Sequence, residues 1–119
     1  MTEIKDAVSI QFVKGEDEKG YPEIRLFRDL DGKKGKAIYK FFNPKTITIE
    51  NFKSIHKMYL IDKEGELLTR KINLSFSENH IKEVTSTYNW NSEKEFERFI
   101  RFSIRYSNCL LYTSPSPRD

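Results

Sequence analysis

The stretch that most constrains the fold is residues 58–76, MYLIDKEGELLTRKINLSF. It begins with the apolar run of residues 58–61 and, after a polar interval, continues with alternating apolar and polar side chains. Successive side chains of a β-strand point to opposite faces, so this period of two predicts a strand with one dry and one wet face. We expect the dry face to carry Leu68, Ile72, Leu74 and Phe76, and the wet face Thr69, Lys71, Asn73 and Ser75.

The interval at residues 62–65, Asp-Lys-Glu-Gly, predicts a tight turn between two strands. Asp62 can accept a hydrogen bond from the backbone ahead of it, and Gly65 can take a positive φ without a Cβ clash. A helix is excluded because Gly65 would interrupt it and the alternate apolar residues would spiral around its surface. The sequence therefore predicts a β-hairpin here.

Other segments also have strand patterns. Alternation predicts a strand that ends at Gly15, with Val8, Ile10 and Phe12 on one face, and a second at residues 24–28, with Ile24 and Leu26 alternating with Arg25. A third, at residues 37–42, carries Ala37, Tyr39 and Phe41 on one face and Ile38, Lys40 and Phe42 on the other, and Pro44 ends it. Residues 45–54 are less regular and favour a short helical turn. Residues 81–90, rich in Val, Thr and Tyr, are typical of a last, partly buried strand.

The final segment has a helical pattern. Ser92 and Glu95 form a capping box, in which each side chain can satisfy a free backbone amide at the start of a helix. One stripe follows at helical spacing, and Glu97 to Arg101 predicts an i,i+4 ion pair on the wet side. The expected stripe is Phe96, Phe99, Ile100, Ser103 and Ile104. The predicted fold class is mainly β with α (α+β): an antiparallel sheet assembly, curled or two-layered, closed by one C-terminal amphipathic helix.

Length and composition favour one modest domain. The chain has 119 residues, 37% of them hydrophobic, and no apolar run near the roughly 20 residues needed to cross a bilayer. Its first residues resemble neither a secretory signal nor a transit peptide, so we expect it to act in the compartment where it is made. The net charge of +3 is too balanced to predict a nucleic-acid ligand.

Residues 109–119, CLLYTSPSPRD, differ from the charged sequence before them and have no periodicity. They also resemble the translation of a transposon-based sequencing adaptor. We expect residues 1–108 to form the single domain and residues 109–119 to be an adaptor-derived or disordered tail. The only cysteine, Cys109, lies in that tail, which leaves no disulfide and no thiol nucleophile to consider.

The motifs of catalysis and metal binding were not found. His56 and His80 are too few and too isolated for a metal cluster, and we expect both near water at strand ends. Residues 32–36, Gly-Lys-Lys-Gly-Lys, lack the glycine spacing, the Ser or Thr and the following helix of a phosphate-binding loop. No residues resemble a nucleophile and base pair. We therefore expect no enzyme activity, no cofactor and no metal.

The sequence favours a binding surface over an active site. Basic residues recur on the predicted strands and on the helix, where Arg98, Arg101 and Arg105 follow one another, and aromatic residues lie among them. The candidate partner-binding residues are Arg25, Arg28, Lys40, Arg70, Lys71 and Arg105; the aromatic residues are Tyr39, Phe41, Phe42, Tyr59 and Tyr88. A solvated basic face over an aromatic core explains this composition equally well. A single-stranded nucleic-acid reader also combines a basic groove with stacking aromatics, but most of these aromatics share parity with core positions.

Several short motifs occur in the order and spacing of a known family. They are IQFVKG at residues 10–15, FNP at 42–44, MYLIDKEGE at 58–66, Thr69-Arg70, EFERF at 95–99, Arg101-Phe102 and Arg105-Tyr106. From about Ser9 to Tyr106 the chain closely resembles the photosystem II reaction-centre Psb28 family. Phe96 departs from the pattern, because the family often has Trp there, and residues 109–119 replace the family's own tail.

The resemblance implies a non-catalytic photosystem II assembly and repair factor. Such a protein is expected to dock peripherally on the cytosolic or stromal face of the thylakoid membrane, through protein contacts. Its expected partners are photosystem II core subunits and the inner chlorophyll antenna in assembly intermediates, and it is expected to leave before the oxygen-evolving complex is complete. A cyanobacterial or a plastid origin fits equally. Under this interpretation nucleic acid is not a partner, and a single-stranded nucleic-acid-binding β domain is the alternative.

Overall fold

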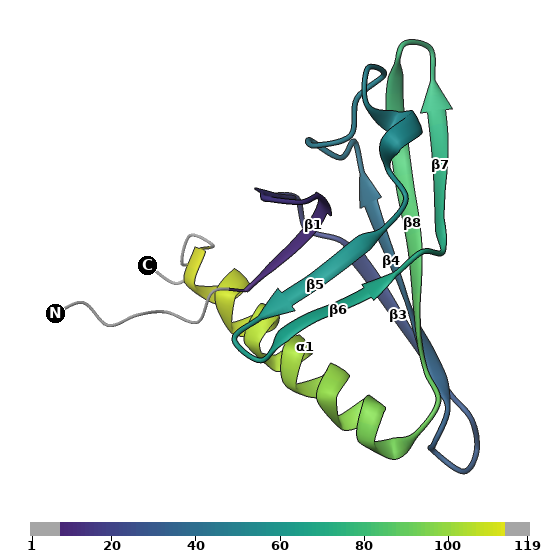
Figure 1. Cartoon of the computed structure of the whole chain (residues 1–119), viewed down its shortest axis with the longest axis vertical. Helices are drawn as coiled ribbons and strands as arrows, with labels where there is room; N and C mark the ends of the chain where they lie inside the picture. The colour runs from purple at the N-terminus through teal and green to yellow at the C-terminus, as the bar shows by residue number, and fades with distance from the viewer. Residues whose placement is uncertain (1–7, 114–119) are drawn as a thin grey trace, which may run out of the picture.

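The computed structural model describes residues 8–113, with side chains through Cys109. In chain order the elements are β1 (Ser9–Val13), β2 (Glu16–Asp17), β3 (Glu23–Arg28), β4 (Gly35–Phe42), the single 3₁₀ turn η1 (Phe52–Ser54), β5 (Met58–Asp62), β6 (Gly65–Thr69), β7 (Ile72–Ser77), β8 (His80–Trp90) and α1 (Glu93–Thr113). The strands form two antiparallel four-stranded sheets, in the orders β2-β1-β5-β6 and β3-β4-β8-β7. The predicted fold class is therefore confirmed as two layers and one helix (Figure 1). Among the described residues no helix is long and apolar enough to cross a membrane.

The predicted hairpin is β5 and β6. Asp62 pairs with Gly65 across the turn, and the backbone amide of Glu64 donates a 3.0 Å hydrogen bond to Asp62 Oδ1. Gly65 has a φ of +128°, a conformation that costs other residues a Cβ clash. The two residue types that predicted the turn thus have the roles expected of them.

The second half of the stretch is not one strand, contrary to our expectation. The chain leaves the first sheet after Thr69 and enters the second at Ile72. The hydroxyl of Thr69 is central to this crossing, because it donates a 2.6 Å hydrogen bond to the carbonyl of Thr87 and accepts one from the amide of Lys71. Strand parity resets at the break, so β6 buries Thr69 rather than Leu68, and Leu68 and Phe76 remain 36% and 48% exposed.

Strands β1, β4 and β8 lie where the patterns predicted, and β4 buries Ala37, Tyr39 and Phe41 as expected. Strand β2 was not predicted. The expected dry face of β3 is wrong: all six of its residues are exposed, Ile24 at 43% and Leu26 at 53%. Strand β3 is at the sheet edge and pairs only with β4, so alternation identified the strand, but Ile24 and Leu26 lie beyond the part of the core that would cover them.

Helix α1 packs against β5 of one sheet and β8 of the other, and in Figure 1 it runs diagonally below β5 and β6 from the lower end of β8. The capping box forms: the amide of Glu95 donates to Ser92 Oγ at 3.1 Å, and the Glu95 carboxylate accepts from the amide of Asn91 at 2.7 Å. Residues 109–113 continue the helix, whereas residues 114–119 of the expected tail lie outside the described residues.

The predicted helical stripe needs one correction. Phe99 is buried, and Phe96 and Ile100 are half-buried against the core, but Ile104 is 56% exposed. The residues that complete the buried stripe are Phe102 and Tyr106. The sheets meet the helix around Phe99, so Phe102 and Tyr106, about one and two turns further along on the same side, are buried, and Ile104, rotated away from that line, is not.

Candidate functional site

One face of the β3-β4-β8-β7 sheet points away from the core. Alternation along β4 puts Ala37, Tyr39 and Phe41 inside, so the residues between them point outward, and the antiparallel register extends this division to the paired strands. We call this surface the outer face. It carries Glu23, Arg25 and Phe27 of β3; Lys36, Ile38, Lys40 and Phe42 of β4; Glu83, Thr85, Thr87 and Asn89 of β8; and Asn73 and Ser75 of β7.

The outer face is basic, and its charge is unevenly distributed. One pocket, the mixed pocket, is lined by Glu23, Arg25, Ile38, Lys40, Glu83 and Thr85. There two carboxylates offset two cations, and Lys40 Nζ lies 3.9 Å from a Glu83 oxygen. A second, the basic pocket, is lined by Lys36, Arg70 and Lys71 together with Asn73, Thr87 and Asn89. No carboxylate is among the described residues that line it.

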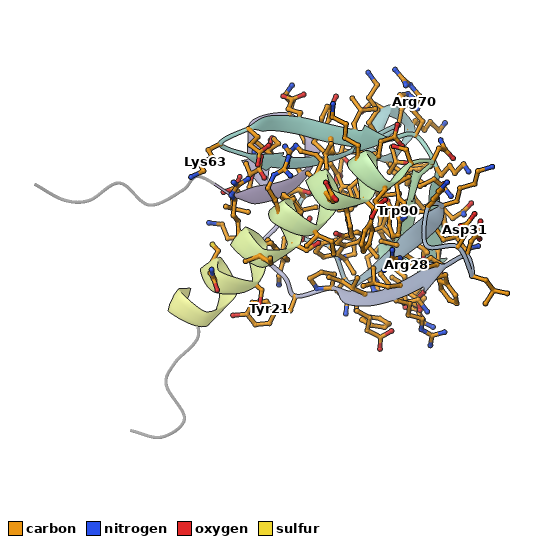
Figure 2. The ribbon with its side chains drawn as sticks, turned by 90° about the horizontal axis from the view of Figure 1, so that it is seen from below. Tyr21, Arg28, Asp31, Lys63, Arg70 and Trp90 are labelled. Atoms are coloured by element: carbon orange, nitrogen blue, oxygen red, sulfur yellow. The ribbon has the colours of Figure 1, made fainter. Side chains whose placement is uncertain are left out.

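Four of the six predicted partner-binding residues gather at these two pockets. Arg25 and Lys40 line the mixed pocket, and Arg70 and Lys71 line the basic pocket. As expected, Arg25, Arg70 and Lys71 are exposed. Arg70 and Lys71 lie at the crossing between β6 and β7 rather than within a strand. Figure 2 shows Arg70 at the periphery of the molecule and Trp90 in the interior beside α1.

Arg28 makes intramolecular contacts away from the outer face. It pairs in register with Gly35 on the side of β3 that faces α1. Its guanidinium carbon lies 3.9 Å from the centroid of the Phe96 ring, and its Nη2 donates a 2.7 Å hydrogen bond to the carbonyl of Gly32. Arg28 thus joins the β3–β4 loop to the first turn of α1, a structural role for a side chain that the sequence suggested for docking.

Arg105 belongs to a network between α1 and the β5–β6 turn. Its Nη1 donates to Asp62 Oδ2 at 2.9 Å and to Glu64 Oε2 at 2.6 Å. Arg98 makes a bidentate contact with Asp62, and Arg101 makes one with Glu64. The expected pairing of Arg101 with Glu97 is replaced by this contact, and Glu97 acts on Arg101 only as a nearby charge. The three arginines therefore connect the helix to the first sheet.

The network shifts the pKa values of both carboxyl groups downward. Burial alone would raise the pKa of Asp62, but hydrogen bonds from Arg98 and Arg105 outweigh it and hold the pKa below its usual range. Hydrogen bonds from Arg101 and Arg105 lower the pKa of Glu64 to about 2. Both carboxylates are ionised at neutral pH, so each arginine faces a full negative charge.

The aromatic residues do not form a stacking surface on the outer face. Tyr39 and Phe41 are buried in the core, Tyr88 stacks on Phe99 with ring centroids 5.6 Å apart, and the ring of Tyr59 receives Lys14 Nζ at 4.6 Å. Of the described outer-face residues only Phe27 and Phe42 are aromatic, and they lie near opposite ends of the sheet, as their pairing with Lys36 and Glu83 shows.

Among the binding residues it proposed, sequence reasoning missed four polar residues of the basic pocket: Lys36, Asn73, Thr87 and Asn89. The alternation of β4 could have identified Lys36, because it shares parity with Lys40. To identify Thr87 and Asn89 one must know the register of β8 with β4, which no local sequence pattern encodes. His56 and His80 are exposed, as expected; His80 begins β8 and His56 lies two residues before β5. The described residues contain no group of His, Cys, Asp or Glu that could hold a metal ion.

Comparison with known proteins places this domain in a family. The model of the Psb28 protein family matches residues 10–110, nearly all of the described structure. The chain belongs to the Psb28 family. The match begins in β1 and ends in α1, so it includes both sheets, the hairpin of Asp62 and the arginines that bind it.

Individual relatives support the same family membership. A photosystem II reaction center Psb28 protein of Prochlorococcus marinus (strain NATL2A) is 69% identical over 110 residues, which cover 92% of this chain and 97% of the relative. A protein of the same name from Synechococcus sp. (strain CC9902) is 41% identical over 121 aligned positions, covering 100% of this chain and 92% of the relative. Both organisms are cyanobacterial, which fits one of the two origins considered from the sequence.

Proposed function

We propose that this protein is a non-catalytic assembly and repair factor of photosystem II. In this role it docks peripherally on the cytosolic or stromal face of the thylakoid membrane, on intermediates that contain core subunits and the inner chlorophyll antenna. Membership of the Psb28 family and relatives named as photosystem II reaction center proteins support the proposal. Their high coverage makes the comparison one of whole domains rather than a shared fragment.

The observation that carries the docking role is the outer face. It presents Arg25, Lys36 and Lys40, with Arg70 and Lys71 at its margin, against the two carboxylates of Glu23 and Glu83 among the described residues. A surface with excess positive charge steers the encounter with an acidic partner and fixes its orientation. Three arginines of α1, in contrast, are already paired with Asp62 and Glu64. The outer face therefore offers a partner positive charge that these arginines do not.

A pull-down from detergent-solubilised thylakoids tests the proposal. Tagged wild-type protein should retrieve photosystem II intermediates that lack the oxygen-evolving apparatus. Arg70→Glu should retrieve less of them while its circular dichroism spectrum stays unchanged. Lys53→Glu, an exposed charge reversal on η1, is the matched control and should retrieve as much as wild type. If Arg70→Glu unfolds the domain, Arg70 is a structural residue and not a docking residue.

The same protein preparation can be used to distinguish photosystem II docking from the alternative, binding of single-stranded nucleic acid. A reader of single strands needs a basic groove whose bases stack on exposed aromatics, and Phe27 and Phe42 are too separated on the outer face to provide one. Binding to oligonucleotides would also weaken steeply as salt is raised. Tight oligonucleotide binding at physiological salt, with no photosystem II protein retrieved, would overturn the proposed function.

A further inference from the structure

We infer that the basic pocket is a binding site for a single carboxylate, supplied by an acidic side chain in an exposed segment of a partner protein. This inference rests on the proposed function, because that function supplies the partner. It goes further by naming the point on the outer face where the partner is recognised and the chemistry that is recognised. It also adds Lys36 and Asn89 to the residues involved.

The geometry of the pocket centres on Asn89. This residue pairs with Lys36 across the β4–β8 ladder, and its Oδ1 accepts a 3.0 Å hydrogen bond from Lys71 Nζ on the other side. The ammonium of Lys71 therefore lies against Asn89, and Lys36 is the neighbour of Asn89 on β4. The Asn89 oxygen accepts from Lys71, so the NH₂ group, with its two donors, is available to an anion. The pocket thus combines two ammonium groups, an amide donor, the Thr87 hydroxyl and the Arg70 guanidinium, a set suited to an anion with several acceptor lone pairs.

The charges of the basic pocket are not compensated within the described structure. In the mixed pocket Glu23 and Glu83 offset Arg25 and Lys40, but no carboxylate lines the basic pocket. Lys36 makes only a distant contact, with its Nζ 5.5 Å from the centroid of the Phe27 ring. Like charges held near one another raise the free energy of the unoccupied surface, and an entering carboxylate relieves that repulsion. Both pockets lie on the outer face of the same sheet, so the absence of a lining carboxylate distinguishes the basic pocket from the mixed pocket.

A protein side chain suits the pocket better than a membrane surface does. Binding to a lipid surface favours protruding cations and apolar side chains that enter the headgroup region. Here the ammonium of Lys71 is held against Asn89, and the lining is polar except for Ile72. The cations therefore line an open, mainly polar surface pocket that an acidic side chain can approach. An aspartate or glutamate on an exposed segment has the charge and the reach for it.

The first experiment measures where an acidic peptide binds. Isotopically labelled protein is titrated with a hexaglutamate peptide at low salt and followed by NMR. We expect the largest shifts at Lys36, Lys71 and Asn89, including the Asn89 side-chain amide, and smaller ones around the mixed pocket. The variant Lys36→Gln/Arg70→Gln should lose these shifts, while the matched variant Arg25→Gln/Lys40→Gln should keep them. Shifts of equal size over the whole outer face would overturn the inference.

The second experiment uses the thylakoid pull-down with the same two variants. Removing both cations of the basic pocket should reduce retrieval of photosystem II intermediates about tenfold, whereas the mixed-pocket variant should lose far less. Equal losses for the two folded variants, or no loss for either, would overturn the inference and leave the proposed function standing. Failure of wild type to retrieve any photosystem II protein would reject the proposed function, and the peptide titration would still decide the site.

A vesicle-binding assay distinguishes a protein carboxylate from a lipid headgroup as the ligand of the basic pocket. Wild type and both variants are sedimented with vesicles that contain phosphatidylglycerol. We expect no difference between the two variants in this assay. Vesicle binding that is lost only in Lys36→Gln/Arg70→Gln, without shifts from the hexaglutamate peptide, would identify the ligand as a lipid headgroup and overturn the inference.

Discussion

Asp62 Oδ1 accepts a 2.7 Å hydrogen bond from Arg98 Nη2, a residue 36 positions further along the chain. The contact joins the end of β5 to the second turn of α1, and a parallel bond from Arg98 Nη1 to Asp62 Oδ2 makes it bidentate. The Asp62 side chain has no exposed surface, and that of Arg98 is 17% exposed. The hairpin turn and the helix are therefore held together by a buried ion pair, in addition to the apolar contacts of the core.

Asp62→Asn should destabilise the domain strongly. The substitution keeps the shape of the side chain but leaves Arg98 and Arg105 without the charge that they share, and removing one partner of a buried pair costs about 3–5 kcal/mol. We expect a loss near the lower end, about 3 kcal/mol, because Glu64 remains as a partner of Arg105. Urea unfolding followed by circular dichroism measures it. Glu66→Gln, which removes an exposed pair with Lys14, is the control and should barely move the midpoint.

Stability should fall in acid because of the same network. The folded-state pKa of Glu64 is about 2, below its ordinary value of 4.5, and the pKa of Asp62 is also lowered. A lowered carboxyl pKa stabilises the fold fully above the ordinary value, and this contribution is lost as pH falls through the folded-state value. Urea midpoints should therefore decline between pH 4.5 and about pH 2. Glu64→Gln should be less stable at neutral pH and should show a shallower decline; an unchanged slope would mean that Glu64 does not contribute.

Gly35→Ala should destabilise the fold because β4 meets β3 and Trp90 closely at this residue. A Cβ at Gly35 would collide with the carbonyl oxygen of Phe27, in the paired strand β3, and with two ring carbons of Trp90, which is fully buried. Overpacking of this kind costs about 1–3 kcal/mol. The control is Gly20→Ala, where an added Cβ meets no atom within 4 Å, and its thermal midpoint should match that of wild type. Equal midpoints for the two variants would show that Trp90 can shift.

Deleting residues 109–119 should change the melting temperature little. The prediction follows from the change in composition at Cys109, and it holds if residues 1–108 form the complete domain. The structure makes the test sharper, because residues 109–113 extend α1 by about one turn and Cys109 lies beside Tyr106 in the lining of a shallow pocket. A loss of several degrees by differential scanning calorimetry would show that this turn belongs to the domain.

Local patterns predicted much of the fold because the responsible interactions are local. The turn at Asp62 and Gly65 forms within four residues, and the cap of Ser92 and Glu95 forms within one helical turn. The parity of β4 was correct because both of its neighbours, β3 and β8, continue the same sheet and the core covers one side along its length. In the turn and the cap the interacting groups are close in sequence, and in β4 alternation alone was enough because the core covers one face of the whole strand.

Sequence patterns were enough to recognise the family resemblance and to predict a strand-rich fold with one C-terminal helix, and they suggested a basic surface that includes Arg25, Lys40, Arg70 and Lys71. Which cations are already paired within the molecule became clear only from the packing of the elements. Arg105 and Lys71 look alike in sequence, but Arg105 meets Asp62 and Glu64 across the fold, whereas Lys71 meets a neutral asparagine. The physical reason is that an ion pair depends on distance in space, and the pairing of α1 with a turn some 40 residues earlier is set by the packing of the core rather than by local sequence.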